Sequence, residues 1–102
     1  LQAGASGSMT SAMIPDQIKP VIEHFLAGRT DQAASTYARV LPAINFENRQ
    51  CGFRATKVVM EEGGVIQSSF CRHPIPSLHP QTKAGLLELL KPLNPVALNW
   101  GK

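Results

Sequence analysis

Two cysteines and two histidines are the residues whose types could hold a metal ion. Cys71 is followed closely by His73, and His79 comes after two intervening prolines. Structural zinc sites usually pair their ligands at spacings of about two to four residues on both sides of the site. Cys51 has no such near partner. The spacing therefore favours a loop with one buried thiol and two surface histidines, and we expect no metal site.

Other groups could serve acid–base or covalent chemistry, but each has a simpler interpretation. Glu23 and His24 are neighbours, and neighbours on a helix lie about 100° apart and face different ways. Cys51 falls on an apolar helical face, which is typical of an inert thiol. The run 4–8 resembles a phosphate-cradling loop but lacks the Lys-Ser/Thr ending of a P-loop and the full spacing of a dinucleotide fingerprint. The sequence therefore predicts no catalytic residue in this chain.

The basic residues are spread along the chain, which has a net charge of only +3. A nucleic-acid-binding protein usually gathers such residues on one face or stripe. Arg49, Arg54 and Lys57 fall on one predicted helix, where we expect a solvated face or ion pairs. The glutamates available for such pairs are Glu47, Glu61 and Glu62. The charge pattern thus argues against nucleic acid as a partner.

Length and composition bound the protein class. A chain of 102 residues has room for one domain at most, and 43% hydrophobic residues argue against disorder. Two cysteines are too few for a disulfide framework, so reduced thiols in a cytoplasmic protein are expected. We expect no membrane-spanning segment and no signal peptide. A chain that opens on Leu1 instead of Met is consistent with a piece cut from a longer one.

Apolar spacing predicts a first helix from about Pro15 to about Leu26. Proline suits the first helical turn, where its missing N–H is not needed, and Gly28 is a stop signal. Pro20 conflicts with this helix, and it predicts either a kink or a later start near Lys19.

A second helix follows after a short connection, which predicts an antiparallel helical hairpin. Thr30 or Asp31 is expected to cap it with a side-chain oxygen. Its apolar positions extend to Ile44, and Pro42 predicts a kink over about 38–41.

A third helix is predicted from Glu47 or Asn48 to about Glu62, ended by the double glycine at 63–64. Prolines forbid a helix in the stretch 65–78.

The last helix should begin near Pro80 and end by Lys91. The apolar terminal segment 95–100 is expected to dock on the body.

The first twelve residues are mostly glycine, alanine, serine and threonine. They are consistent with a flexible linker, or with a short strand and loop packed closely within a larger body. Met9, Met13 and Ile14 favour the strand, because linkers seldom contain such residues. The composition by itself leaves both interpretations open.

Several motifs, in order from Leu1 to about Leu90, resemble the dihydrodipicolinate synthase / N-acetylneuraminate lyase family. Each motif is loose alone, but their shared order is fairly specific. The matching segments are 1–11, similar to the eighth barrel strand; 25–33, similar to the helix hairpin; 40–44, similar to the kinked second helix; and Lys57, Gly63-Gly64 and 71–75, similar to the Lys…Gly…Arg-x-Pro pattern.

This resemblance implies a mainly α-helical segment: the last strand and helix of a (β/α)8 TIM barrel followed by C-terminal helices. Residues 1–28 would form the last βα unit, and residues 29–102 a C-terminal helical extension. A whole barrel needs roughly 250 residues, so the chain would hold only its end. A further set of residues looks most like the family members that dehydrate 2-keto-3-deoxy sugar acids: 44–52, 62–66, 73–74 and 98–102.

The resemblance also implies a mechanism. Family members form a Schiff base between a lysine on the sixth strand and the 2-keto group of the substrate, assisted by a tyrosine on the fifth strand. Neither residue would lie in this chain. Because active sites lie at the C-terminal ends of barrel strands, Gly7, Ser8, Met9 and Thr10 would instead form a wall of the substrate pocket. Met9 matches an apolar family position beside the keto acid, and Thr10 is the polar candidate for a substrate contact.

The expected partner is therefore a 2-keto acid, bound by a cytoplasmic homotetramer of the kind found in the family. We expect no cofactor, metal, nucleic acid or membrane. An aldolase or synthase of the same family is one alternative. A free-standing helical interaction module without chemistry is another, and a small basic nucleic-acid binder is a third.

Overall fold

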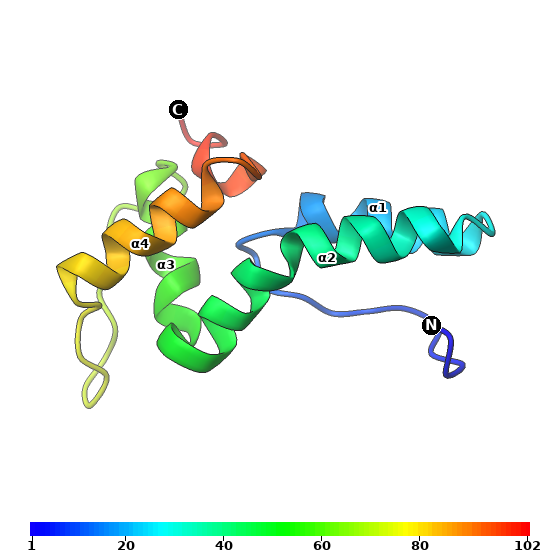
Figure 1. The fold of residues 1–102 in the computed structure, drawn as a ribbon. Coiled ribbons are helices and arrows are strands. Elements are labelled where there is room, and N and C mark those ends of the chain that lie inside the picture. Colours follow the sequence, from blue (N-terminus) through cyan, green and yellow to red (C-terminus); the bar gives the residue numbers. More distant parts are fainter.

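The computed structural model describes residues 1–102 as helices joined by turns and coil, with no β-strand. The elements are α1 (Pro15–Leu26), α2 (Thr30–Phe46), the π-helical turn η1 (Glu47–Cys51), α3 (Phe53–Glu62), α4 (Pro80–Leu90) and the short 3₁₀ helix η2 (Val96–Leu98). Figure 1 shows α1 and α2 as one elongated arm, with α3, α4 and the C-terminal segment gathered at the far end of α2. No helix is both long and apolar enough to cross a lipid bilayer.

The helix α1 has the predicted bounds, Pro15–Leu26. It begins with Pro15 and stays helical through Pro20, so the later start near Lys19 is wrong. A single proline removes one backbone hydrogen bond close to the first turn, and the rest of the helix keeps its packing face. Gly28, at φ +79°, ends the helix as expected.

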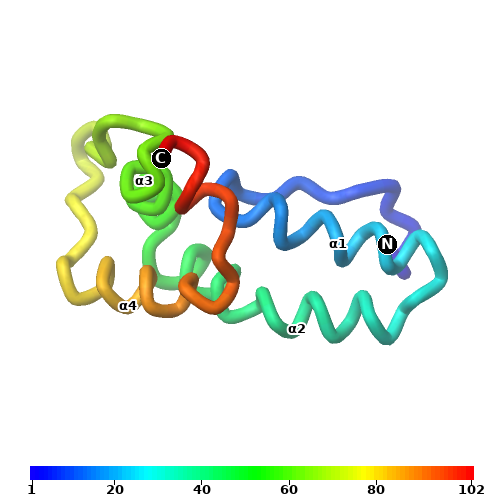
Figure 2. Tube along the Cα trace, turned by 90° about the horizontal axis from the view of Figure 1, so that it is seen from above, coloured from blue at the N-terminus to red at the C-terminus, as the bar shows by residue number.

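The α1–α2 hairpin is confirmed, and the two helices run side by side in opposite directions (Figure 2). The predicted cap is wrong, because α2 already begins at Thr30 and the preceding Arg29 makes no side-chain cap bond. The backbone supplies the turn instead: the Arg29 N–H donates to the His24 carbonyl at 2.8 Å. Pro42 does not interrupt the helix, although the ribbon of α2 bends over its C-terminal half in Figure 1.

The boundary between the second and third helices differs from the prediction. Residues 47–51, expected to open the third helix, continue α2 as the π-helical turn η1. The break comes at Gly52, with φ 60° and ψ −155°. That region of backbone conformation is essentially restricted to glycine. The apolar spacing runs through Gly52 without interruption, so it gave no sign of this break.

The stretch 65–78 has no helix, and α4 spans Pro80–Leu90, both as predicted. Of the two outcomes expected for the basic residues here, a solvated face or ion pairs, Arg49 shows the first, because its side chain is exposed. Arg54 and Lys57 form no ion pair. Arg54 donates instead to the carbonyls of Cys51 and Pro76, and Lys57 donates to the carbonyl of Phe70. Long basic side chains on α3 thus fasten the irregular stretch to the helix by backbone hydrogen bonds.

The C-terminal segment docks on the body, as predicted, and it crosses the chain at the double glycine. The Gly101 N–H donates to the Gly63 carbonyl at 2.9 Å. A Cβ atom built on Gly63 would lie 1.7 Å from the Ala97 carbonyl oxygen, and one built on Gly101 would lie 2.0 Å from the Gly64 carbonyl oxygen. Gly63 and Gly101 therefore permit a backbone-to-backbone crossing that a side chain would block.

The apolar core lies where the hairpin meets α3, α4 and the C-terminal segment. Met13 and Ile14, just before α1, are fully buried. They join a core cluster with residues from every later helix: Ile18, Val40, Ala43, Cys51, Ala55, Val58, Val59, Leu86, Leu90, Leu93 and Ala97. The N-terminal segment is therefore anchored to the body at its downstream end.

The strand expected over residues 1–11 is not formed. These residues lie as coil along the hairpin arm. A β-strand needs a neighbouring strand to satisfy its backbone donors and acceptors, and no other segment of this chain supplies one. Burial of Met13 and Ile14 nevertheless shows that the end of the segment is packed and is not a free linker.

The glycine crossing generates a stability prediction. Replacing Gly63 with Ala should destabilise the protein by about 2 kcal/mol, because backbone must move to admit the methyl group. The matched control is Gly85→Ala in α4, where the new Cβ would meet Phe46 at an ordinary 3.9 Å. The control should raise stability by about 0.5–1 kcal/mol through helix propensity. Thermal unfolding of both variants measures the difference, and equal melting temperatures would contradict a tight crossing.

Candidate functional site

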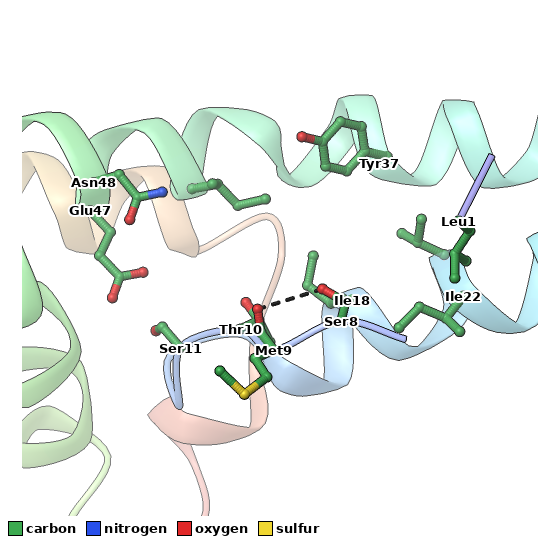
Figure 3. Close-up of a pocket in the computed structure, with 12 residues that line it drawn as sticks. Leu1, Ser8, Met9, Thr10, Ser11, Ile18, Ile22, Tyr37, Glu47 and Asn48 are labelled. Atoms are coloured by element: carbon green, nitrogen blue, oxygen red, sulfur yellow. Dashed lines mark hydrogen bonds between the residues drawn. The ribbon is translucent and has the colours of Figure 1, made fainter. Parts of the chain in front are cut away.

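An open hollow of about 630 Å³ lies between the N-terminal segment and the inner faces of α1, α2 and η1 (Figure 3). Apolar side chains from α1 and α2 form much of its surface, and polar groups come from the coil and from η1. The residues that line it are Leu1, Ser8, Met9, Thr10, Ser11, Ile18, Val21, Ile22, Tyr37, Ile44, Glu47 and Asn48.

Three of the four predicted wall residues line this hollow. Ser8, Met9 and Thr10 are among its lining residues, whereas Gly7 is not. All four are exposed, and Met9 is 98% exposed. The Ser8 hydroxyl makes only a long contact of 3.5 Å to the Met9 carbonyl. The wall side chains are therefore free to meet another molecule or another part of a larger protein.

Glu47 is a polar residue of the site that the sequence prediction missed. Glu47 is the only charged residue that is buried in this structure, and 9% of it is exposed. No cationic group lies within 4.0 Å of its carboxylate. Its carboxylate accepts a 2.6 Å hydrogen bond from the Thr56 hydroxyl. From the sequence, Glu47 was predicted to form an ion pair with a nearby basic residue. Its hydrogen bond to Thr56 becomes evident only in the folded structure.

The contact continues from Thr56 to the coil. The hydroxyls of Thr56 and Ser11 are 3.0 Å apart, and the Ser11 hydroxyl oxygen accepts from the Met13 N–H at 2.9 Å. Because the single hydroxyl proton of Thr56 is used on Glu47, Ser11 must donate to Thr56. The chain of donors thus runs in one direction, from Met13 through Ser11 and Thr56 to Glu47.

The residues first considered for metal binding are not brought together. Cys71 is buried, while His73 and His79 are exposed. His79 uses its Nδ1 to accept from the Gln81 N–H at the start of α4, and no three His, Cys, Asp or Glu side chains form a cluster.

The acid–base pair considered on α1 is likewise separated. Glu23 pairs with Lys19 at 3.7 Å. His24 accepts from Arg29 at 3.0 Å through its Nδ1. Each side chain therefore has its own local partner, and the two form no joint site.

Cys51 is a free, buried thiol, 4% exposed, as the apolar pattern predicted. Burial raises the pKa of this thiol above its ordinary value; Arg54 acts in the opposite direction and Glu47 adds to the rise. Since the thiolate is the reactive form, these surroundings suppress nucleophilic chemistry at Cys51.

The hollow combines polar groups with apolar side chains. It offers hydroxyls from Ser8, Thr10 and Tyr37, an amide from Asn48 and an apolar floor. Among its lining side chains there is no lysine, arginine or histidine. It therefore provides neither an amine for a Schiff base nor a basic side chain to hold a substrate carboxylate.

Comparison with known proteins agrees with the sequence resemblance. Residues 1–93 match the profile of the dihydrodipicolinate synthetase family. Over 100 residues the chain is 49% identical to a protein of Azospirillum brasilense named L-2-keto-3-deoxyarabonate dehydratase. That match covers 98% of this chain and 32% of the Azospirillum protein. The chain thus spans about a third of the length of this curated relative.

The burial of Cys51 generates a reactivity prediction. In the folded protein at pH 8, iodoacetamide should alkylate Cys51 at least roughly tenfold more slowly than in urea, because less thiolate is present and access is poor. Mass spectrometry of the peptide that contains Cys51 measures the rate. Alkylation at equal rates in both states would contradict the buried, protonated thiol.

Proposed function

The chain belongs to the dihydrodipicolinate synthetase family, and we propose that it forms the C-terminal part of an enzyme that dehydrates 2-keto-3-deoxy sugar acids. L-2-keto-3-deoxyarabonate is the proposed substrate. The observation that carries this proposal is the 49% identity to the Azospirillum dehydratase across 98% of the chain. The all-helical structure is compatible with the end of a TIM barrel. In this proposal residues 1–28 are the last βα unit and residues 29–102 the helical extension.

The proposed reaction is that of a class I lyase. A lysine amine elsewhere in the whole protein condenses with the 2-keto group, and a tyrosine assists. The resulting imine withdraws electrons, so the neighbouring carbon loses a proton and the electron pair left behind expels the hydroxide of the next carbon as water. Lys57 is not this lysine, because it lies on α3 outside the hollow and donates to the Phe70 carbonyl.

This chain contributes a wall of the substrate pocket in the proposed enzyme. Ser8, Met9 and Thr10 project along an open hollow without strong partners of their own. The Met9 side chain is 98% exposed, so it is accessible to a ligand or to a further part of the protein. The hydroxyls of Ser8 and Thr10 suit hydrogen bonds to the hydroxyl groups of a sugar acid.

We further propose a cytoplasmic homotetramer, as the family resemblance implies. Large apolar side chains outside the hollow remain available for contacts with the rest of the protein or with other subunits. Phe53, Phe70 and Trp100 are each more than half exposed. Analytical ultracentrifugation of the complete protein tests the tetramer.

Borohydride trapping tests the proposed Schiff base. The complete protein, incubated with pyruvate and sodium borohydride, should gain one covalently reduced adduct per subunit at a lysine outside residues 1–102. The 102-residue chain alone should gain none, because its own lysines are not placed in the hollow. Mass spectrometry of both proteins provides the measurement. Stoichiometric labelling of a lysine within the 102 residues would contradict the proposal that the Schiff-base lysine lies outside this chain.

Substitutions in the wall test its contact with substrate. In the complete enzyme, Met9→Ala and Thr10→Val should each raise KM for the 2-keto-3-deoxy acid by roughly tenfold. This is the loss of affinity expected when one contact with the substrate, worth about 1.4 kcal/mol of binding free energy, is removed. Ser35→Ala on α2 is the control, because Ser35 is exposed and does not line the hollow. If both wall variants kept the affinity and turnover of the parent enzyme, the wall assignment would be wrong.

A further inference from the structure

We propose that Glu47 is a positioning residue, which fixes the wall residues Ser8–Thr10 through Thr56 and Ser11. This inference rests on the proposed function, because it assigns a task to the wall of that same site. The relay is defined by Glu47, Thr56, Ser11 and the N–H of Met13.

The relay connects three separate parts of the fold. Glu47 begins η1, Thr56 lies on α3, and Ser11 lies in the coil that precedes α1. The two links on the Glu47 side measure 2.6 Å and 3.0 Å, and the backbone link to Met13 measures 2.9 Å. These lengths are normal or short for hydrogen bonds between oxygen atoms and from N–H to oxygen. The relay is thus continuous from the coil to the carboxylate.

The charge on Glu47 gives the relay its direction. A carboxylate accepts hydrogen bonds and, when ionised, donates none. It therefore orients the Thr56 proton toward itself, which leaves the Thr56 oxygen to accept from Ser11. Hydrogen bonds to a charged acceptor are stronger than neutral ones. A buried carboxylate without a cation is costly unless it is hydrogen-bonded, so Glu47 and Thr56 depend on each other.

The relay ends at the residue next to the wall. Ser11 follows Thr10 directly, and both Ser11 and Glu47 line the hollow with the wall. Downstream, Met13 and Ile14 are fully buried in the core. The relay and the core thus fix the chain just after Thr10, where coil backbone would otherwise be free to rotate. Figure 3 shows Ser11 at the end of the coil, on the side from which the Glu47 side chain approaches.

Loss of the Thr56 hydroxyl should therefore displace the wall without removing any wall residue. In the complete enzyme, Thr56→Val keeps the side-chain shape but breaks both side-chain links of the relay. We expect KM for L-2-keto-3-deoxyarabonate to rise roughly tenfold while kcat stays within about twofold, the pattern of lost uniform binding. Thr56→Ser keeps a hydroxyl at the same position and should restore KM. Thr82→Val on α4 is the control, since Thr82 is also half-buried and its hydroxyl has no partner.

Hydrogen exchange provides a second readout that does not need turnover. In Thr56→Val, backbone amides in the peptide 8–13 should exchange at least several-fold faster than in the parent protein, and Thr56→Ser should restore protection. Glu47→Leu removes the carboxylate acceptor and Ser11→Ala removes the donor to Thr56, so either variant breaks the relay and replaces Thr56→Val if that variant does not fold. Unchanged KM and unchanged exchange in the folded variants would overturn the positioning role.

The outcomes separate this inference from the proposed function. If the parent enzyme dehydrates the sugar acid but Thr56→Val has normal KM and exchange, only the relay proposal fails. If the parent enzyme does not act on the sugar acid, the proposed function fails, and faster exchange in Thr56→Val then supports only the ordering of the coil. A rise in KM that Thr56→Ser does not restore would also overturn the relay, because it would not depend on the hydroxyl.

Discussion

The chain reversal at Gly52 decides which helix faces meet in this protein. At φ 60° and ψ −155° the backbone leaves the axis shared by α2 and η1, and α3 departs in a new direction. Cys51 on one side of the break and Ala55 on the other enter the same core cluster. The same reversal brings Thr56 to the carboxylate of Glu47. A residue with a Cβ atom would resist this conformation, so the arrangement depends on glycine at this position.

The chain reversal at Gly52 places α3 between the C-terminal segment and the N-terminal coil, and α3 contacts each of them in a different way. On one side, α3 presents Gly63 to the C-terminal segment, which crosses it with backbone against backbone. The crossing also brings Val96 to α1, where its N–H donates to the Asp16 carboxylate at 3.1 Å. On the other side, Glu47 and Thr56 face the N-terminal coil and hold Ser11. The first contact closes the core, while the second orders the rim of an open hollow.

Much of the fold followed from local sequence signals, and the differences have physical causes. Pro15, Gly28 and Pro80 act through local backbone geometry, so they located helix ends correctly. Gly52 was missed because its effect depends on a φ and ψ pair that spacing does not encode. The double glycine was recognised as a helix stop, yet its second role at the crossing depends on a segment far away in sequence. The strand expected near Met9 needs pairing partners that this chain does not contain.

In the candidate site, too, sequence motifs predicted some residues, while contacts between residues distant in the sequence determine the role of others. The family motifs predicted a substrate-pocket wall at 7–10, and that role stays a prediction. Ser8, Met9 and Thr10 line the hollow, while Gly7 does not. The sequence did not predict Glu47 as a site residue, because its role depends on its burial and on its hydrogen bond to Thr56, which lies beyond the break at Gly52. The comparisons establish the family, and the proposed reaction depends on groups outside these residues.

Turnover by the complete protein tests the central claim most directly. L-2-keto-3-deoxyarabonate is incubated with the enzyme, and the products are followed by mass spectrometry. A single product lighter than the substrate by one molecule of water is the predicted result. Cleavage to pyruvate and a two-carbon aldehyde, or an unchanged substrate, would contradict the account of this chain as part of a sugar-acid dehydratase.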